Sequence, residues 1–194
     1  MSRIVKPGQP VIFMKIGIHA RESLDTIIER KLKEIDDEGM AFWGYGGNTC
    51  HPRSMVQPFA TAQVAKGKPI YLVMEKMQSN HWAEPVRSDE YSVDGQVWRP
   101  VPTGIHVLGS RFALAIKNLQ PADFELPLSR THVAEGPSRG RIGSGYVSGR
   151  VDKACLELDE GVQVPSAPDE KMAPIGLVAE LCEPFAVFLR NTPL

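Results

Sequence analysis

The chain has 194 residues, of which 42% are hydrophobic and 23% are charged, and its formal net charge is −1. This length and composition predict a single domain over residues 1–194 with a sizeable apolar core. The balanced charge excludes a uniformly basic nucleic-acid-binding surface, so a nucleic-acid or nucleotide partner requires a local basic patch.

The cysteines and the N-terminus indicate the compartment. Cys50, Cys155 and Cys182 are far apart and form no Cys-x-x-Cys pair, which argues against a structural zinc site and a disulfide framework. The first residues lack the apolar core of a signal peptide, and no stretch approaches the roughly 18 apolar residues that suggest a membrane span. We therefore expect a soluble, cytoplasmic protein with reduced thiols and no membrane partner.

The first predicted elements are a strand and a long helix. Residues 11–18 are apolar and β-branched, which predicts a buried strand. Ser23 is a natural N-cap for a helix over residues 24–38, and Gly39 suits its C-terminal cap. The apolar residues at helical spacing, which we expect to face the core, are Leu24, Ile27, Ile28, Leu32 and Ile35.

A second strand and a short helix follow. Residues 41–45 predict the strand, and the glycines after it indicate a turn. Pro58 suits the first turn of a helix over residues 58–66, which Gly67 ends. Residues 70–74 predict the third strand.

The second half of the chain is predicted to be mainly β. Asp94-Gly95, flanked by alternating residues, is a strong hairpin signal. Residues 160–174 contain three prolines and three acidic residues and predict a surface loop. Further strands are predicted at residues 105–108, 111–116, 151–158 and 177–189. This order predicts an α+β fold with a mixed or mostly antiparallel sheet, which has enough strands to roll into a partly closed β-barrel.

The aromatic and glycine-rich run over residues 40–47 is the first candidate site. Trp43 and Tyr45 are two residues apart, so in a strand they point to the same face and could form two walls of a pocket that stacks on a base. Asn48 and His51 follow the glycines, where a loop can aim side chains at a ligand. The alternative, that Trp43 only fills the core against the first helix, stays open.

Residues 136–150 form a second candidate site. Arg139, Arg141 and Arg150 lie there among serines and glycines, and guanidinium groups and glycine amides suit phosphate oxygens. The spacing matches neither a P-loop nor a dinucleotide fingerprint, so a solubilising loop is the alternative. The five histidines show no His-x-x-x-His spacing, and we expect no metal and no cofactor.

Several features occur in order over residues 11–75: the first strand, the helix capped by Ser23, the strand that carries Trp43, and the strand after Gly67. This order resembles the PUA-like superfamily, and within it the EVE and YTH domains. In those families a β-barrel holds an aromatic pocket that accepts a modified base, and a tryptophan follows the first helix in a comparable place. The resemblance implies that Trp43 is a wall of such a cage.

The favoured interpretation is a non-enzymatic binding domain that recognises a nucleotide or a modified nucleic-acid base. One alternative is an enzyme that acts on a nucleotide or another small molecule through Cys50 or His51 with a carboxylate such as Glu75. Another is a protein-interaction or inhibitor module anchored by Trp82 and Trp98. Binding is favoured over catalysis because no histidine motif accompanies the cysteine.

Overall fold

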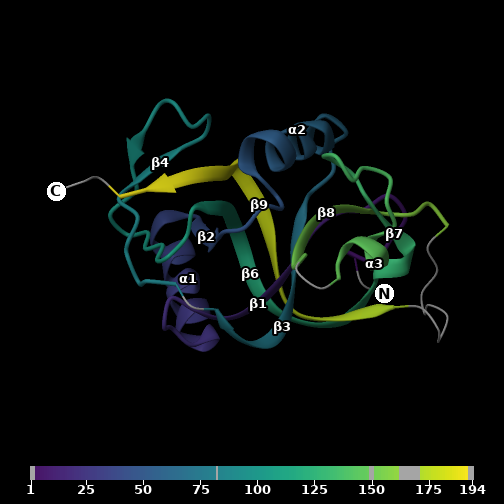
Figure 1. The fold of residues 1–194 in the computed structure, drawn as a ribbon, viewed down its shortest axis with the longest axis horizontal. Helices are drawn as coiled ribbons and strands as arrows, with labels where there is room; N and C mark the ends of the chain where they lie inside the picture. The colour runs from purple at the N-terminus through teal and green to yellow at the C-terminus, as the bar shows by residue number, and fades with distance from the viewer. Residues whose placement is uncertain (1–2, 82, 149–150, 162–170, 192–194) are drawn as a thin grey trace.

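The computed structural model describes residues 3–81, 83–148, 151–161 and 171–191. In that part of the chain the fold consists of one sheet, three α-helices and two short helical turns (Figure 1). The elements in chain order are β1 (Pro10–His19), α1 (Leu24–Glu38), β2 (Ala41–Tyr45), a π-helical turn (Pro52–Val56), α2 (Gln57–Ala65), β3 (Tyr71–His81), β4 (Glu90–Ser92), β5 (Arg99–Pro100), β6 (Phe112–Pro127), a 3₁₀ turn (Leu128–Arg130), β7 (Thr131–Val133), α3 (Gly143–Tyr146), β8 (Lys153–Leu158) and β9 (Met172–Arg190).

The described strands form one mixed sheet. The strand order of the sheet is β2-β6-β9-β3-β1-β8-β7. In addition, β4 pairs with β9, and β5 pairs with β4. β1 and β3 are parallel, and α1, β2 and α2 lie between them in the chain, as a parallel connection requires. β2 and β7 end the path, so the described sheet is not closed. The α+β class and the mixed sheet agree with the sequence prediction, whereas the sheet curves without closing into a barrel.

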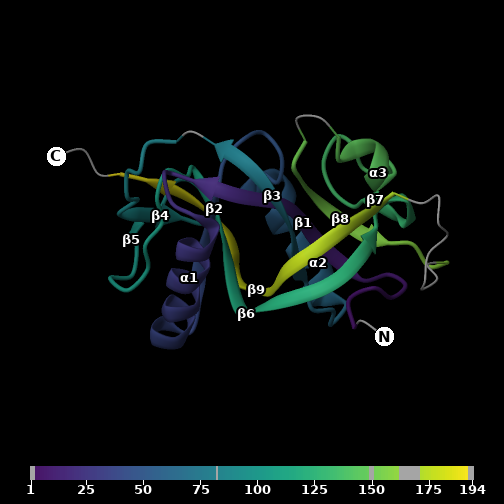
Figure 2. The same cartoon turned by 90° about the horizontal axis from the view of Figure 1, so that it is seen from below.

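The long strands β6 and β9 carry the curvature. They pair antiparallel along most of their length, and their register shifts at three places. Bulges of this kind bend and twist a strand pair, and Figure 2 shows β6 and β9 running side by side through the length of the molecule. The sheet separates two cores, because Ile12 and Met14 of β1 enter one core and Val11 and Phe13 enter the other.

Helix α1 occupies the predicted range, but its buried face differs from the prediction. The Ser23 hydroxyl accepts a backbone hydrogen bond from the first turn, and Gly39 adopts the left-handed conformation that ends the helix. Lys31 and Glu34 are buried, whereas Leu32, expected in the core, is 41% exposed. The reason is an ion pair between Lys31 Nζ and Glu34 Oε2 at 2.9 Å, which allows two charged side chains to lie on the core side.

One predicted strand of the second half is wrong, and one predicted loop is described only at its ends. Residues 105–108 are not a strand: Ile105 and Val107 are buried by side-chain packing, and Leu108 forms a single bridge to Arg87. Within the predicted loop 160–174, residues 172–174 belong to β9 and pair with β6, while residues 162–170 lie outside the described residues. The hairpin predicted around Asp94-Gly95 does form, because β4 and β5 on either side of it pair antiparallel.

Gly44 of β2 is a position where the fold has no room for a side chain. A Cβ there would overlap the Ser110 hydroxyl and lie 2.7 Å from Val107 Cγ1. We expect Gly44→Ala to lower the free energy of unfolding by about 1–3 kcal/mol, the usual cost of overpacking a core. Gly46→Ala is the matched control, since a Cβ at Gly46 meets open space. Equal losses of stability for the two variants in urea denaturation would contradict this account.

Candidate functional site

A cavity of about 670 Å³ lies between β1 and β2, the strand that ends the sheet path. Residues 14–19 of β1 line one wall, and residues 43–49, which run from β2 into the following turn, line the other. Every residue of both runs lines the cavity. Since successive side chains of a strand point to opposite faces, a cavity on one face would be lined by alternate residues only, so this cavity lies along the edges of the strands. We call this space the seam cavity. Its other lining residues are Glu22, Ile27, Arg30, Lys31, Met77, Val107, Leu108, Ser110, Val151, Asp152 and Lys153.

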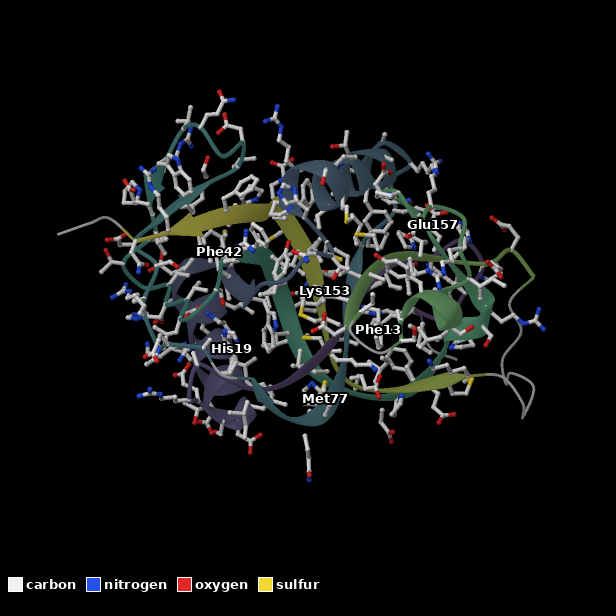
Figure 3. All side chains as sticks on the ribbon, viewed as in Figure 1. Phe13, His19, Phe42, Met77, Lys153 and Glu157 are labelled. Carbon is white, nitrogen blue, oxygen red and sulfur yellow. The ribbon has the colours of Figure 1, made fainter. Side chains whose placement is uncertain are left out.

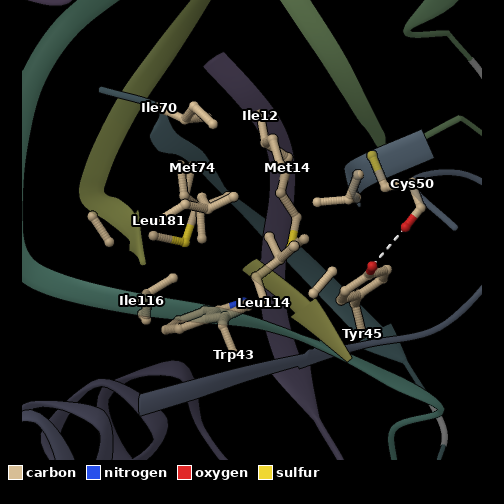
Figure 4. Close-up of a cluster of buried hydrophobic side chains, with 14 of the residues drawn as sticks. Ile12, Met14, Trp43, Tyr45, Cys50, Ile70, Met74, Leu114, Ile116 and Leu181 are labelled. Atoms are coloured by element: carbon tan, nitrogen blue, oxygen red, sulfur yellow. Dashed lines mark hydrogen bonds between the residues drawn. The ribbon is translucent and has the colours of Figure 1, made fainter. Parts of the chain in front are cut away.

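Trp43 and Tyr45 border the seam cavity and also fill the core. Their side chains are 5% and 4% exposed and belong to the same apolar cluster as Leu114 and Ile116 (Figure 4). The Tyr45 hydroxyl donates a hydrogen bond of 2.6 Å to the Cys50 carbonyl. Burial raises the pKa of this phenol, so it stays protonated as the donor. The two rings are therefore a fixed part of the cavity wall.

The turn after β2 gives the seam cavity an open side. A Cβ at Gly46 would meet open space, and Gly47 has φ +85°, a conformation that favours glycine. Asn48 is exposed and lines the cavity. His51 does not line it.

The His51 ring lies elsewhere, packed edge to face against Phe112 and Phe188 with ring centroids 5.5 and 5.4 Å away. Its Nδ1 accepts a hydrogen bond of 3.4 Å from the Ser54 backbone amide at the start of the π-helical turn. The structure therefore places His51 in a packing and capping position rather than beside Trp43 and Tyr45.

Lys153 brings a cation to the cavity from β8. Its side chain is buried, and Nζ lies 5.9 Å from the centre of the Tyr45 ring and 2.7 Å from Asp152 Oδ1. Figure 3 shows Lys153 near the middle of the molecule, with His19 and Met77 below it in this view. Nζ would also lie 3.3 Å from a Cβ at Gly47, so the ammonium group reaches across to the turn after β2.

His19 makes a second side-chain connection across the seam. Its Nε2 lies 3.1 Å from the Leu108 carbonyl and 3.3 Å from Ser110 Oγ. A carbonyl can only accept, so Nε2 carries the proton of the first of these hydrogen bonds. Because Ser110 packs against Gly44, this contact links the end of β1 to β2, two strands that do not pair within the described part of the chain.

A cluster of charged groups on α1 forms another part of the wall. Lys31 is 2% exposed, and its Nζ donates to Glu34 and, at 2.7 Å, to the His106 carbonyl. Glu34 Oε1 accepts from the His106 amide at 2.9 Å, while Arg30 pairs with Glu22. Burial lowers the pKa of Lys31 to about 8 although Glu34 opposes this shift.

The charges that line the seam cavity are mainly positive. The lining residues that carry a positive charge are Lys15, Arg30, Lys31 and Lys153, and those that carry a negative charge are Glu22 and Asp152. Lys15 makes no ion pair with another described residue. A cavity with this balance attracts anions more strongly than neutral or cationic ligands.

The arginine-rich segment lies apart from the seam cavity. Arg139 and Arg141 are exposed, and neither lines the cavity. Arg141 Nη2 donates to the Gly145 carbonyl at 2.9 Å, and its guanidinium lies 5.9 Å from the Tyr146 ring, so it holds its loop against α3. Arg150 lies outside the described residues. Phosphate binding by these arginines stays a prediction for a separate surface.

Among the described residues, those named for the alternative functions do not line the seam cavity. Cys50 is 1% exposed and faces Cys155, with the two Sγ atoms 3.8 Å apart, whereas a catalytic thiol must meet both a base and a substrate. Glu75 does not line the seam cavity. Trp98 is covered by the Arg190 guanidinium at 4.0 Å from the ring centre, and Trp82 lies outside the described residues.

No protein-family model matches the chain, and neither a curated protein nor a solved structure is similar to it. The PUA-like resemblance therefore stays a prediction.

Of the helices in the described residues, none combines the length and the apolar composition that crossing a membrane requires. The described side chains also contain no group of three or more His, Cys, Asp or Glu arranged to hold a metal ion.

Sequence reasoning missed the polar half of the cavity wall. Lys15, Lys31 and Lys153 lie in segments that read as ordinary strand or helix, and only the fold brings them together. One signal was present: Ile27, Lys31 and Glu34 follow the spacing of a buried helix face, with charged residues at two of its three positions. A charged residue on the buried face of a helix indicates either a buried ion pair or a ligand-binding site.

The lowered pKa of Lys31 predicts a pH-dependent stability. Between about pH 8 and the unfolded value of 10.5, the unfolded chain keeps the proton and the folded chain has lost it, so stability from this group rises with pH. Relative to Lys31→Met, the wild type should gain about 2 kcal/mol of unfolding free energy between pH 7 and pH 10. Urea denaturation at both pH values measures this, and a constant difference would contradict the burial of a charged Lys31.

Proposed function

We propose that the seam cavity binds a nucleotide or a nucleobase that carries a phosphate, and that the protein is a binding domain. The observation that carries this proposal is the meeting of Trp43 and Tyr45 with Lys153 around one cavity, with Lys153 Nζ 5.9 Å from the centre of the Tyr45 ring. A volume of about 670 Å³ lies within the range of small-molecule sites, roughly 300–1,000 Å³. The aromatic and apolar walls suit a planar ring, and the ammonium groups suit phosphate oxygens.

The phosphate is expected on the Lys153 side. Lys153 is 5% exposed and has Asp152 as its ion-pair partner among the described residues. An anion within reach of its Nζ would add a charge-assisted hydrogen bond in a setting with little water. Lys15 follows Met14, the strand partner of Lys153, so Lys15 borders the same region of the wall while its side chain points to the other face of β1.

The base is expected against the wall formed by Trp43 and Tyr45. Because both rings are nearly covered by core residues, only their cavity-facing edges are available, and a ligand would contact them rather than be sandwiched between them. The strand edges at residues 14–19 and 43–49 offer backbone groups to the hydrogen-bonding edge of a base. The PUA-like resemblance supports the same class of ligand through Trp43.

Binding of nucleoside 5′-monophosphates tests the proposal. Isothermal titration calorimetry should show that at least one of them binds and that its nucleoside without phosphate binds more weakly. Lys153→Met keeps the length of the side chain and removes its charge, and we expect it to weaken binding by about tenfold to a hundredfold. Arg141→Gln is the matched control and should leave the affinity unchanged.

Two outcomes would contradict the proposal. The seam cavity is not a nucleotide site if no monophosphate binds the folded wild type. If Arg141→Gln abolishes binding while Lys153→Met does not, the phosphate lies on the arginine-rich loop and not in the seam cavity.

A further inference from the structure

Two thiols lie behind the wall of the seam cavity and take no part in the binding proposed above. Cys50 directly follows the turn residues 46–49, and Cys155 lies in β8 two residues after Lys153. Their Sγ atoms are 3.8 Å apart and both side chains are buried. The thiols therefore connect the two sides of the cavity wall where the turn after β2 approaches β8.

The geometry allows a bond between these sulfurs with little movement. A disulfide has its sulfurs about 2 Å apart, so the Sγ atoms must approach each other by roughly 1.8 Å. Cys155 is held in place, because its strand partner is Ile12 in the middle of the sheet. Cys50 is the movable partner: it lies outside the helices and strands, has φ +53°, and follows two glycines.

We propose that Cys50 and Cys155 are a redox modification site, at which a hydroperoxide forms a reversible disulfide that narrows the seam cavity. The Cys50 thiol loses its proton and its sulfur attacks an oxygen of the hydroperoxide. The O–O bond breaks, ROH leaves, and Cys50 becomes a sulfenic acid. The Cys155 sulfur then attacks the Cys50 sulfur, the S–O bond breaks, and the hydroxyl leaves as water with the Cys155 proton.

The electrons and atoms balance in this reaction. Two thiols lose two electrons and two protons, and one ROOH becomes ROH and water. Cys50 reacts first because it follows the turn residues 46–49, which line the cavity, and lies outside the strands that hold Cys155, so a movement of this turn exposes the buried Cys50 sulfur to a small oxidant. The hydrogen bond with Cys50 and burial both raise the pKa of the Cys155 thiol, which makes Cys155 the resolving partner.

The disulfide affects the cavity through the turn. Drawing Cys50 towards β8 pulls residues 46–49 in the same direction, and Lys153 Nζ already lies 3.3 Å from a Cβ position at Gly47. The cavity becomes narrower beside its cationic wall, so a bound phosphate loses room. This consequence rests on the proposed function, whereas the formation of the disulfide does not.

The test treats the full chain with hydrogen peroxide, alkylates the remaining thiols and identifies linked peptides by mass spectrometry. We expect a Cys50–Cys155 link in the wild type and in Cys182→Ser, its loss in Cys155→Ser, and its removal by a dithiol reductant. With adenosine 5′-monophosphate as the probe, oxidation should weaken binding by about fivefold or more and reduction should restore it. Peroxide should leave the affinity of Cys155→Ser unchanged.

Several results would overturn the inference. If Cys50 and Cys155 stay unlinked in the folded, peroxide-treated wild type, the pair is not a modification site. If they link and the affinity is unchanged, the disulfide does not regulate the cavity. Binding to the reduced wild type is measured separately. If neither adenosine 5′-monophosphate nor any other nucleoside 5′-monophosphate binds, the proposed function is contradicted, and the mass measurement remains the test of the disulfide.

Discussion

The bend shared by β6 and β9 is the constraint on which the rest of the structure depends. Within the described residues β2 pairs with β6 alone, and β1 is joined to β9 through β3. The course of the two long strands therefore determines where β1 and β2 lie relative to each other. The bulges in the β6–β9 ladder bend the sheet until β1 and β2 face each other, but no ladder joins them in the described residues. The seam cavity exists because this curvature stops short of closure.

Side-chain contacts connect the two sides of the seam cavity, whereas backbone hydrogen bonds connect neighbouring strands elsewhere in the sheet. His19 connects β1 to the Leu108 region, and Lys153 reaches the turn beyond β2. Two buried ammonium groups at the seam have partners: Lys31 has Glu34 and the His106 carbonyl, and Lys153 has Asp152. The result is a largely positive cavity beside aromatic rings, which is the physical basis of the proposed nucleotide site.

Much of the first half of the fold is readable from the sequence, because its signals are local. The cap at Ser23, the left-handed residue at Gly39 and the spacing of apolar residues place α1 where it is observed. The lengths of β6 and β9 are not readable in this way, since their pairing joins distant residues across bulges. For the site, local patterns indicate Trp43, Tyr45 and Asn48, whereas the cations are brought to them by tertiary contacts from β1, α1 and β8.

Hydrogen–deuterium exchange with and without adenosine 5′-monophosphate tests the central claim most directly, because it reads out backbone protection at each wall separately. A nucleotide bound in the seam cavity should slow exchange in residues 14–19 and 43–49, which line its two sides. Residues 136–146, which carry Arg139 and Arg141 away from the cavity, should exchange at the same rate in both conditions. Protection of residues 136–146 with no change at either wall would contradict it.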